Sequence, residues 1–199
     1  NVHNNYYFLV QLSVQLKSKL EGFTLVSCFS QNKDELIIEF NNESQSFFIK
    51  ASLLANFCCL SFPNTFNRAR KNSVDLFNEV LMKQVITITQ YENERSFSIQ
   101  LEDDYSLLFK MHGNRSNVVL FRGDQPINVF RNHLASDREI KLSTLHRSIG
   151  WDQQSFNQHR TNLSSHYFTF GKWAWVWLEE RNFSSMDVEA QWRELNALK

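Results

Sequence analysis

The chain has 199 residues, with 21 basic and 21 acidic side chains, and therefore a formal net charge of zero. Its five Gly and two Pro residues exclude collagen-like and Pro/Gly-rich disordered proteins. A hydrophobic fraction of 42%, which includes 18 Phe residues, indicates a globular protein with an aromatic core, of a length that fits one domain plus a small appendage.

Leucines at helical spacing near the N-terminus predict a first helix that ends before Gly22. Asn4 and Asn5 can cap its start, because a side-chain oxygen accepts hydrogen bonds from first-turn N–H groups. Gly22 tolerates the left-handed conformation that commonly follows a helix. The apolar face of this helix would consist of Leu9, Leu12, Leu16 and Leu20.

Alternating apolar and polar residues predict antiparallel strands on either side of a second helix. Ser73 can cap this helix, and Val74, Phe77 and Leu81 would form its apolar face. The expected strands are 23–30, 35–40, 47–53 and 57–60 before the helix, and 85–91, 96–101, 105–111, 118–121 and 127–130 after it.

The two strand-rich segments form an internal repeat. Leu36 corresponds to Phe97 and Ile38 to Ile99, although chance matching between alternating strands is the alternative explanation. Each half would be a helix followed by a meander of strands that cannot cover its own apolar face. Stacking the two meanders predicts an α+β fold, a two-sheet antiparallel β-sandwich built from a duplicated helix-plus-meander unit, over residues 1–135.

Strand-like alternation stops near 134–137, and residues 136–199 are expected to form a small helical region. Helices are predicted at 152–167, 171–181 and 186–198. Trp173, Trp175 and Trp177 could stack on nucleic-acid bases. Positions two apart fan around a helix axis, however, so at least one of these Trp side chains is expected in the core.

No sequence pattern points to catalysis, a cofactor or a metal. The G-x-S-x-G, P-loop and G-x-G-x-x-G motifs are absent. The histidines are scattered, with His159 and His166 on one helix face, and metal sites need more ligands than that. The three cysteines, Cys28, Cys58 and Cys59, form no C-x-x-C pair, so we expect reduced, buried thiols.

The sequence also lacks membrane and export signals. No apolar run reaches the roughly 18–20 residues of a membrane helix, and the N-terminal segment does not have the pattern of a signal peptide. We therefore expect a cytoplasmic protein that is not an enzyme, has no cofactor and does not associate with membranes.

Two turn-forming segments and one basic cluster are candidates for nucleic-acid binding. The segment 92–95 contains Glu94 and Arg95, and the segment 110–117 combines a tight Gly-Asn turn with hydrogen-bond donors that suit a phosphate or ribose. The basic cluster consists of Arg68, Arg70 and Lys71. An ordinary polar turn is the alternative for each turn segment, and the zero net charge predicts weak RNA binding by this chain alone.

Residues 7–130 resemble the N-terminal domain of the NFACT family, whose bacterial members are also known as fibronectin-binding proteins. The most specific segment is the turn Gly113-Asn114-Arg115-Ser116-Asn117, which runs into an apolar strand. The other matching segments are 6–20, 34–38, 66–71 and 93–97. The arrangement is most similar to that of Bacteroidetes-type members, and the helical remainder is similar to the start of the helical module that follows in the family.

The resemblance implies a sandwich like the N-terminal domain of formamidopyrimidine-DNA glycosylases. Those enzymes use an N-terminal Pro as nucleophile with a neighbouring Glu, whereas this chain begins Asn1-Val2. Glycosylase chemistry is therefore expected to be absent even where the fold is shared.

The resemblance also implies binding of tRNA on the obstructed large ribosomal subunit, in support of template-free tailing of stalled nascent chains. An Asp-Arg pair of the family is tied to tRNA engagement, and Glu94-Arg95 stands in its place with a carboxylate one methylene longer. Lys110 stands where many members have an acid.

The predicted function is a non-catalytic RNA-binding module of a ribosome-associated quality-control factor, with tRNA and the large ribosomal subunit as partners. RNA contacts are expected from Glu94, Arg95, Arg115, Ser116, Asn117, Arg68, Arg70 and Lys71. A surface adhesin that binds fibronectin is the first alternative. A glycosylase-like nucleic-acid binder without catalytic residues is the second.

Overall fold

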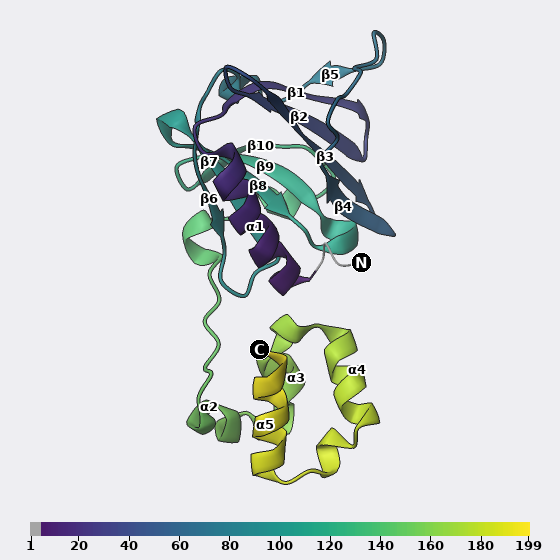
Figure 1. The fold of residues 1–199 in the computed structure, drawn as a ribbon, viewed down its shortest axis with the longest axis vertical. Helices are drawn as coiled ribbons and strands as arrows, with labels where there is room; N and C mark the ends of the chain where they lie inside the picture. The colour runs from purple at the N-terminus through teal and green to yellow at the C-terminus, as the bar shows by residue number, and fades with distance from the viewer. Residues whose placement is uncertain (1–4) are drawn as a thin grey trace. The chain divides into compact units, whose positions relative to one another are not determined.

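The computed structural model describes residues 5–199 and divides the chain into two compact units (Figure 1). One unit ends at His146 and the other runs from Arg147 to Lys199. Residues 1–4 lie outside the described part, and with them the expected cap Asn4. No helix among the described residues is long and apolar enough to cross a lipid bilayer.

The first unit contains two antiparallel five-stranded sheets, which confirms the expected fold class. The first sheet has the strand order β4-β3-β2-β1-β5 and the second has the order β10-β9-β8-β7-β6. The strands of the first sheet are β1 Thr24–Asn32, β2 Glu35–Asn41, β3 Ser46–Leu54, β4 Phe57–Ser61 and β5 Val74–Asp75. Those of the second are β6 Val85–Gln90, β7 Ser96–Leu101, β8 Tyr105–Lys110, β9 Asn117–Arg122 and β10 Gln125–Val129.

Helix α1, Tyr6–Leu20, packs against the second sheet, mainly on β6. The side chain of Asn5 caps it by accepting from the backbone N–H groups of Tyr7 and Phe8 at 2.9 and 3.2 Å. Gly22 has the left-handed φ of +84° that the sequence predicts after the helix. The four leucines at helical spacing are all buried, so one stripe of α1 is part of the main core.

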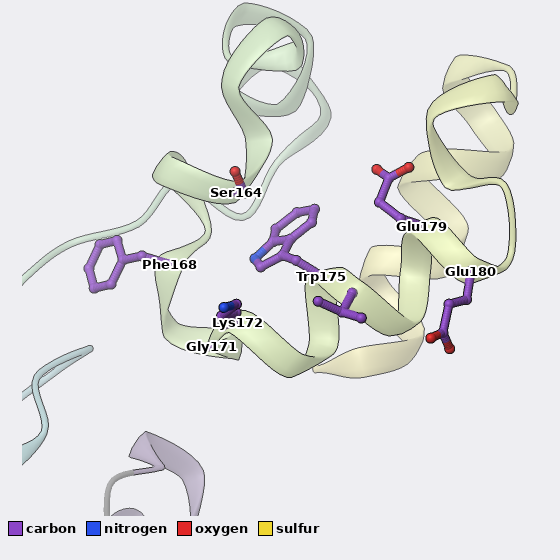
Figure 2. A pocket seen from close by; sticks show the side chains of 8 residues that line it. Ser164, Phe168, Gly171, Lys172, Trp175, Glu179 and Glu180 are labelled. Carbon is purple, nitrogen blue, oxygen red and sulfur yellow. The ribbon is translucent and has the colours of Figure 1, made fainter. Parts of the chain in front are cut away.

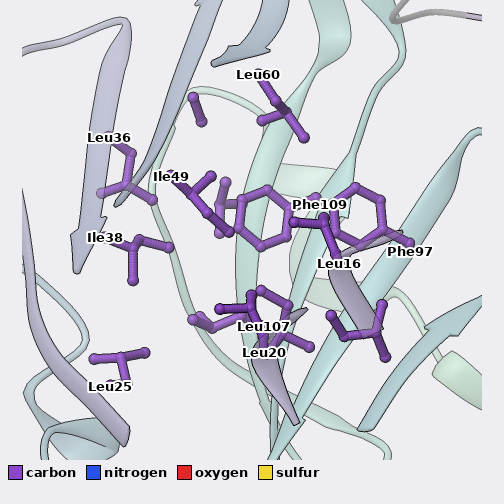
Figure 3. Close-up of a cluster of buried hydrophobic side chains, with 14 of the residues drawn as sticks. Leu16, Leu20, Leu25, Leu36, Ile38, Ile49, Leu60, Phe97, Leu107 and Phe109 are labelled. Carbon is purple, nitrogen blue, oxygen red and sulfur yellow. The ribbon is translucent and has the colours of Figure 1, made fainter. Parts of the chain in front are cut away.

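The main core lies between the two sheets. Figure 3 shows Leu36 and Ile38 of the first sheet across from Leu107 and Phe109 of the second. The rings of Phe97 and Phe109 are stacked, with centroids 5.0 Å apart and planes 5° from parallel. Buried residues of β1–β4 and β6–β9 fill this space, as expected for two meanders packed face to face.

The predicted second helix is wrong. Ser73 is followed by the short strand β5, in which Val74 and Asp75 pair with the edge of β1, and then by a 3₁₀ turn at Asn78–Val80. Phe77 has a φ of +54°, which a continuous α-helix does not contain. Hydrogen bonding to an available sheet edge therefore outweighs the local helical pattern.

The internal repeat is present at the level of the meanders. β1 begins at Thr24 and β6 at Val85, and the first four strands of each half form a meander in the same order. The fifth strands differ, because β5 pairs with β1 whereas β10 pairs with β9. Helix α1 has no counterpart in the second half among the described residues, so the predicted duplication of the helix is not observed.

Each sheet has an outer face that a loop or a tail segment covers. The β4–β5 loop places Phe66 on Phe29, Ile37 and Phe48 of the first sheet. The segment after β10 covers the second sheet with three partly buried apolar residues, Ile140, Leu142 and Leu145. The first unit therefore extends to His146, beyond the boundary expected at 135.

The second unit consists of short helices. They are α2 Gln153–Gln158, α3 Leu163–His166, α4 Lys172–Glu180 and α5 Val188–Leu198. The helix expected at 152–167 is interrupted by a 3₁₀ turn at Arg160–Asn162. Across this interruption the imidazoles of His159 and His166 stack, with centroids 3.7 Å apart.

Candidate nucleic-acid interface

Turns from both sheets meet at one end of the sandwich through the side chain of Arg131. Its Nη1 donates to the carbonyl oxygens of Leu53, at the end of β3, and of Ser116, just before β9, at 2.9 and 3.2 Å. Its Nη2 donates to the carboxylate of Asp34, in the β1–β2 turn, at 3.3 Å. We call this end of the sandwich the turn end; it comprises the β1–β2, β3–β4, β6–β7 and β8–β9 turns.

Arg95 and Arg115 carry exposed cations on two neighbouring turns of the turn end. The backbone N–H of Met111 donates to the carbonyl oxygen of Arg95 at 2.8 Å, which joins the β6–β7 turn to the segment that leads into the β8–β9 turn. Arg115 ends a 3₁₀ turn in which Gly113 has a φ of +65°. Neither Arg forms an ion pair with another described residue, so both guanidinium groups are available to a phosphate.

Glu94, expected to contact RNA, is buried, with 4% of its surface exposed. Its carboxylate is hydrogen-bonded to Nε2 of His112 and accepts from the hydroxyl of Ser96 at 3.4 Å. This contact links the β6–β7 turn to the residue that precedes the β8–β9 turn. Glu94 is thus placed to orient the turn that presents Arg95, and its buried carboxylate is not exposed to a ligand.

Ser116 and Asn117 are fully buried, which contradicts the expected RNA contacts of their side chains. The Ser116 hydroxyl accepts a hydrogen bond from Sγ of Cys58 at 3.1 Å, between the two sheets. Burial raises the pKa of the Cys58 thiol, which keeps it a neutral donor. The polar Ser-Asn pair therefore belongs to the interior, because the turn ends at Arg115 and β9 begins at Asn117.

Asn117 is the centre of a buried polar network that supports the β8–β9 turn. Its side-chain oxygen accepts from the backbone N–H of Arg131 at 2.7 Å, and its nitrogen donates to the Asp137 carboxylate at 2.9 Å. Lys110 donates to the same carboxylate at 2.6 Å, and both charged side chains are buried. Because the charges are paired and hydrogen-bonded, the network fixes the strand ends that flank Arg115.

The basic cluster in the β4–β5 loop is only partly available. Arg68 donates to Ser73 and Asp75 at 2.8 and 2.7 Å, and its guanidinium lies over the ring of Phe29. Arg70 and Lys71 are exposed and form no ion pair with another residue of the 5–199 range. The structure thus assigns Arg68 to the loop's own stability and leaves the other two cations open to a ligand.

Sequence reasoning missed two exposed side chains of the turn end. Lys33 lies in the β1–β2 turn, and Phe57, with 63% of its surface exposed, follows the β3–β4 turn. Alternate turns of a meander lie at the same end of a sheet, because neighbouring strands are antiparallel. This rule could have identified both residues from the sequence, because it places the turns at 33 and 55 at the same end of the first sheet.

The helical unit has an open, mainly apolar groove with a volume of about 740 Å³. Figure 2 shows Trp175 projecting into it, with Phe168 and Lys172 nearby and Glu179 and Glu180 along the far side. The indole of Trp175 packs edge-on against Phe170 and Phe183. Its neighbours on α4, Trp173 and Trp177, are exposed, and Trp175 itself is half-buried, so none of the three lies fully in the core, where the spacing predicts at least one.

No protein-family model and no curated protein matches the chain. Solved structures do match, among them the following three. The N-terminal domain of the fibronectin-binding protein PavA from Streptococcus pneumoniae matches with 17% identity and a TM-score of 0.56, over 63% of this chain and 53% of that one. The fibrinogen-binding protein from Staphylococcus aureus matches with 15% identity and a TM-score of 0.54, over 64% and 50%.

The third structure is the N-terminal part of the fibronectin/fibrinogen-binding protein from Streptococcus suis, with 15% identity and a TM-score of 0.56, over 76% of this chain and 56% of that one. The chain shares the fold of these proteins. It spans about half the length of each. At this level of identity the likeness concerns the fold, which is the architecture that the resemblance to the NFACT N-terminal domain implies.

Proposed function

We propose that the sandwich unit is a non-catalytic RNA-binding module of a ribosome-associated quality-control factor of the NFACT family. Its ligand would be tRNA on the obstructed large ribosomal subunit, in the cytoplasm, where it would support tailing of stalled nascent chains. The observation that carries the proposal is the pair of exposed cations, Arg95 and Arg115, on turns that buried polar contacts hold next to each other. Peptide-bond chemistry would belong to the ribosome.

Three further features support an RNA ligand. Arg70 and Lys71 extend the set of unpaired cations, and the exposed ring of Phe57 offers a surface on which a base can stack. The sandwich also has the fold that the NFACT resemblance implies. The chain has few unpaired cations and no net charge, so we expect it to bind RNA weakly by itself. This fits a module that makes one of several RNA contacts in a larger assembly.

The proposal gives the buried residues a role without RNA contact. Glu94, through His112, would hold the turn that presents Arg95, in the place of the family's Asp. Ser116 and Asn117 would fix the base of the turn that presents Arg115. Within the expected set, the direct contacts are then assigned to Arg95, Arg115, Arg70 and Lys71.

A binding test with substitutions at the turn end separates these roles. We expect Arg95→Ala and Arg115→Ala each to weaken tRNA binding about 5- to 10-fold at 0.1 M salt and to lower the salt dependence by about one phosphate contact. Arg122→Ala is the matched control, because Arg122 is exposed at the other end of β9. Equal affinities for the wild type and both turn-end variants would contradict the proposal.

The same variants apply to the ribosome. Obstructed large subunits that carry peptidyl-tRNA are sedimented with the protein, and we expect recovery of the protein in the pellet to fall for Arg95→Ala but not for Arg122→Ala. Cell fractionation tests the location, since a protein found only at the cell surface would argue against a role on the ribosome.

Fibronectin binding is the second candidate, and the names of two of the three structural neighbours mention it, whereas the third is named for fibrinogen. It predicts saturable binding of the chain to immobilised fibronectin. Under our proposal, such binding is absent or unaffected by Arg95→Ala. Nothing in the described residues favours the glycosylase-like alternative beyond the shared sandwich.

A further inference from the structure

A pocket at the turn end lies between the β1–β2 turn and the segment that follows β10. Its volume is about 490 Å³. It is lined by Lys33, Asp34, Phe130, Arg131, Asn132 and His133. Lys33 and Arg131 are cations and Asp34 is the one acidic residue, so the lining carries a net positive charge.

Arg131 is the buried member of this lining, and its hydrogen bonding is incomplete. Its side chain is 11% exposed. Nη1 donates to two carbonyl oxygens and Nη2 to Asp34, but Nε is buried and has no acceptor among the described residues. Nε and Nη2 form one edge of the planar guanidinium, an edge whose two parallel donors match two oxygens of a phosphate or carboxylate.

Asp34 occupies this edge only in part. Its carboxylate oxygen lies 3.3 Å from Nη2, longer than the roughly 2.7–2.9 Å typical of such charged pairs, and it does not satisfy Nε. The backbone of Asp34 is fixed independently, because its carbonyl oxygen accepts from the N–H of Leu53 at 2.7 Å. Its side chain can therefore move away from Arg131 without disturbing the turn.

We propose that this pocket binds a phosphomonoester, whose oxygens replace the Asp34 carboxylate at Nη2 and complete the hydrogen bonding of Nε. Lys33 and His133, both exposed, supply further charge at the mouth. The volume exceeds that of a phosphate ion and falls in the range of small-ligand sites, so the ligand carries an organic group of about nucleotide size. This site is separate from the proposed tRNA contacts of Arg95 and Arg115, and its occupation does not depend on them.

A phosphate of this kind belongs either to a free nucleotide or to the end of an RNA strand, and the test distinguishes the two. The 199-residue chain is labelled with ¹⁵N, and the Nε–H signal of Arg131, assigned with Arg131→Lys, is followed by NMR. The probes are inorganic phosphate, adenosine 5′-monophosphate, and one short RNA prepared with and without a 5′-phosphate. Sodium chloride at matched ionic strength is the salt control.

We expect adenosine 5′-monophosphate to shift the Arg131 Nε–H signal in a saturable way, and inorganic phosphate to do so with lower affinity. A response to the RNA only when it carries the 5′-phosphate assigns the site to strand ends as well. A response to the mononucleotide but to neither RNA assigns it to free nucleotides. An unchanged Nε–H signal with all four probes at millimolar concentration overturns the proposal.

Removal of the acidic side chain and removal of the basic side chains of the pocket should change its affinity for a mononucleotide in opposite directions. Asp34→Asn removes the competing carboxylate and is expected to tighten mononucleotide binding at least threefold, whereas Lys33→Ala and His133→Ala are expected to weaken it by a similar factor. Arg122→Ala, at the other end of the sandwich, is expected to leave it unchanged. Tighter binding by Lys33→Ala, or weaker binding by Asp34→Asn with an intact NMR spectrum, would contradict the assignment.

Discussion

The ammonium group of Lys110 lies 2.6 Å from the carboxylate of Asp137, and both side chains are almost completely buried. The pair joins the end of β8 to the segment that covers the outer face of the second sheet. Asn117 donates to the other oxygen of the same carboxylate. Removal of either charge leaves the other one buried without an opposite charge beside it, which costs far more than the intact pair contributes.

We therefore predict that Asp137→Leu lowers the free energy of unfolding by about 3–5 kcal/mol. Lys110→Met should cost a similar amount, because it leaves a buried carboxylate. The double variant Lys110→Met/Asp137→Leu should be more stable than either single variant. Urea denaturation of all four proteins measures the cycle, and additive losses would contradict the assignment of a coupled buried pair.

Asn117 and Arg115 should separate stability from RNA binding, although they lie two residues apart. Asn117→Ala removes hydrogen bonds to Asp137 and to the backbone of Arg131, and should cost about 2–3 kcal/mol of stability. Arg115→Ala, on the exposed turn, should change stability by less than about 0.5 kcal/mol while weakening tRNA binding. The two quantities are measured by urea denaturation and by filter binding at temperatures where both variants are folded. A stable Asn117→Ala protein would show that the network is dispensable.

The three thiols should react at different rates. Burial raises the pKa of all three thiols, and that of Cys28 well above its usual value, but Cys59 is the only one of them that is partly exposed to the reagent. Only thiolates react with iodoacetamide at a useful rate. We predict that mass spectrometry finds Cys59 modified first in the folded protein, with Cys28 and Cys58 modified only after unfolding. Rapid modification of Cys28 or Cys58 in the folded Cys59→Ser variant would contradict this order.

The helical unit should lose stability in mild acid. Burial, reinforced by the neighbouring His159, lowers the pKa of His166 below its usual 6.5 in the folded state. The unfolded chain then binds this proton more readily than the folded chain does. The contribution of His166 to the stability of the folded unit is therefore complete above about pH 6.5. It is lost as the pH falls through 6.5 towards the lower pKa of the folded state.

Fluorescence gives a direct measurement of this effect, because all five Trp residues of the chain lie at or beyond position 151, in the helical unit. We predict a lower urea midpoint by Trp fluorescence at pH 5.5 than at pH 7.5. His166→Phe should reduce the difference, whereas His133→Gln, in the other unit, should not. A midpoint that rises at pH 5.5 would reverse the inferred sign.

The alternation of apolar residues was sufficient to predict most strands to within one or two residues, because eight of the ten described strands have one face on a common core. Ser73 and the residues after it were misassigned, since the free edge of β1, a non-local feature, determines their conformation. The same limit applies to Asn117. A polar residue after a Gly-Asn turn suggests a surface, and its burial depends on Asp137 and Arg131, which local pattern does not identify.

The exposure of the predicted cations was easier to infer from the sequence than the burial of the other polar residues. Arg95 and Arg115 are exposed because both lie at turns, which the sequence identifies through Gly and Asn. Burial of Glu94 could not be inferred, because its partner His112 is 18 residues away. The contacts between side chains of different turns are thus the feature of the turn end that only the three-dimensional structure shows.

The apolar cover that Ile140, Leu142 and Leu145 lay over the second sheet has a practical consequence for dissecting the protein. A fragment cut at 135, where strand-like alternation ends, would lose this cover together with Asp137, and would display Leu108, Val119 and Phe121 to water. Such a fragment should aggregate, and its poor behaviour would be mistaken for failure of the sandwich to fold. A fragment that ends after His146 keeps this cover and lacks the helical unit. It is therefore the fragment in which the turn end can be studied without the helices.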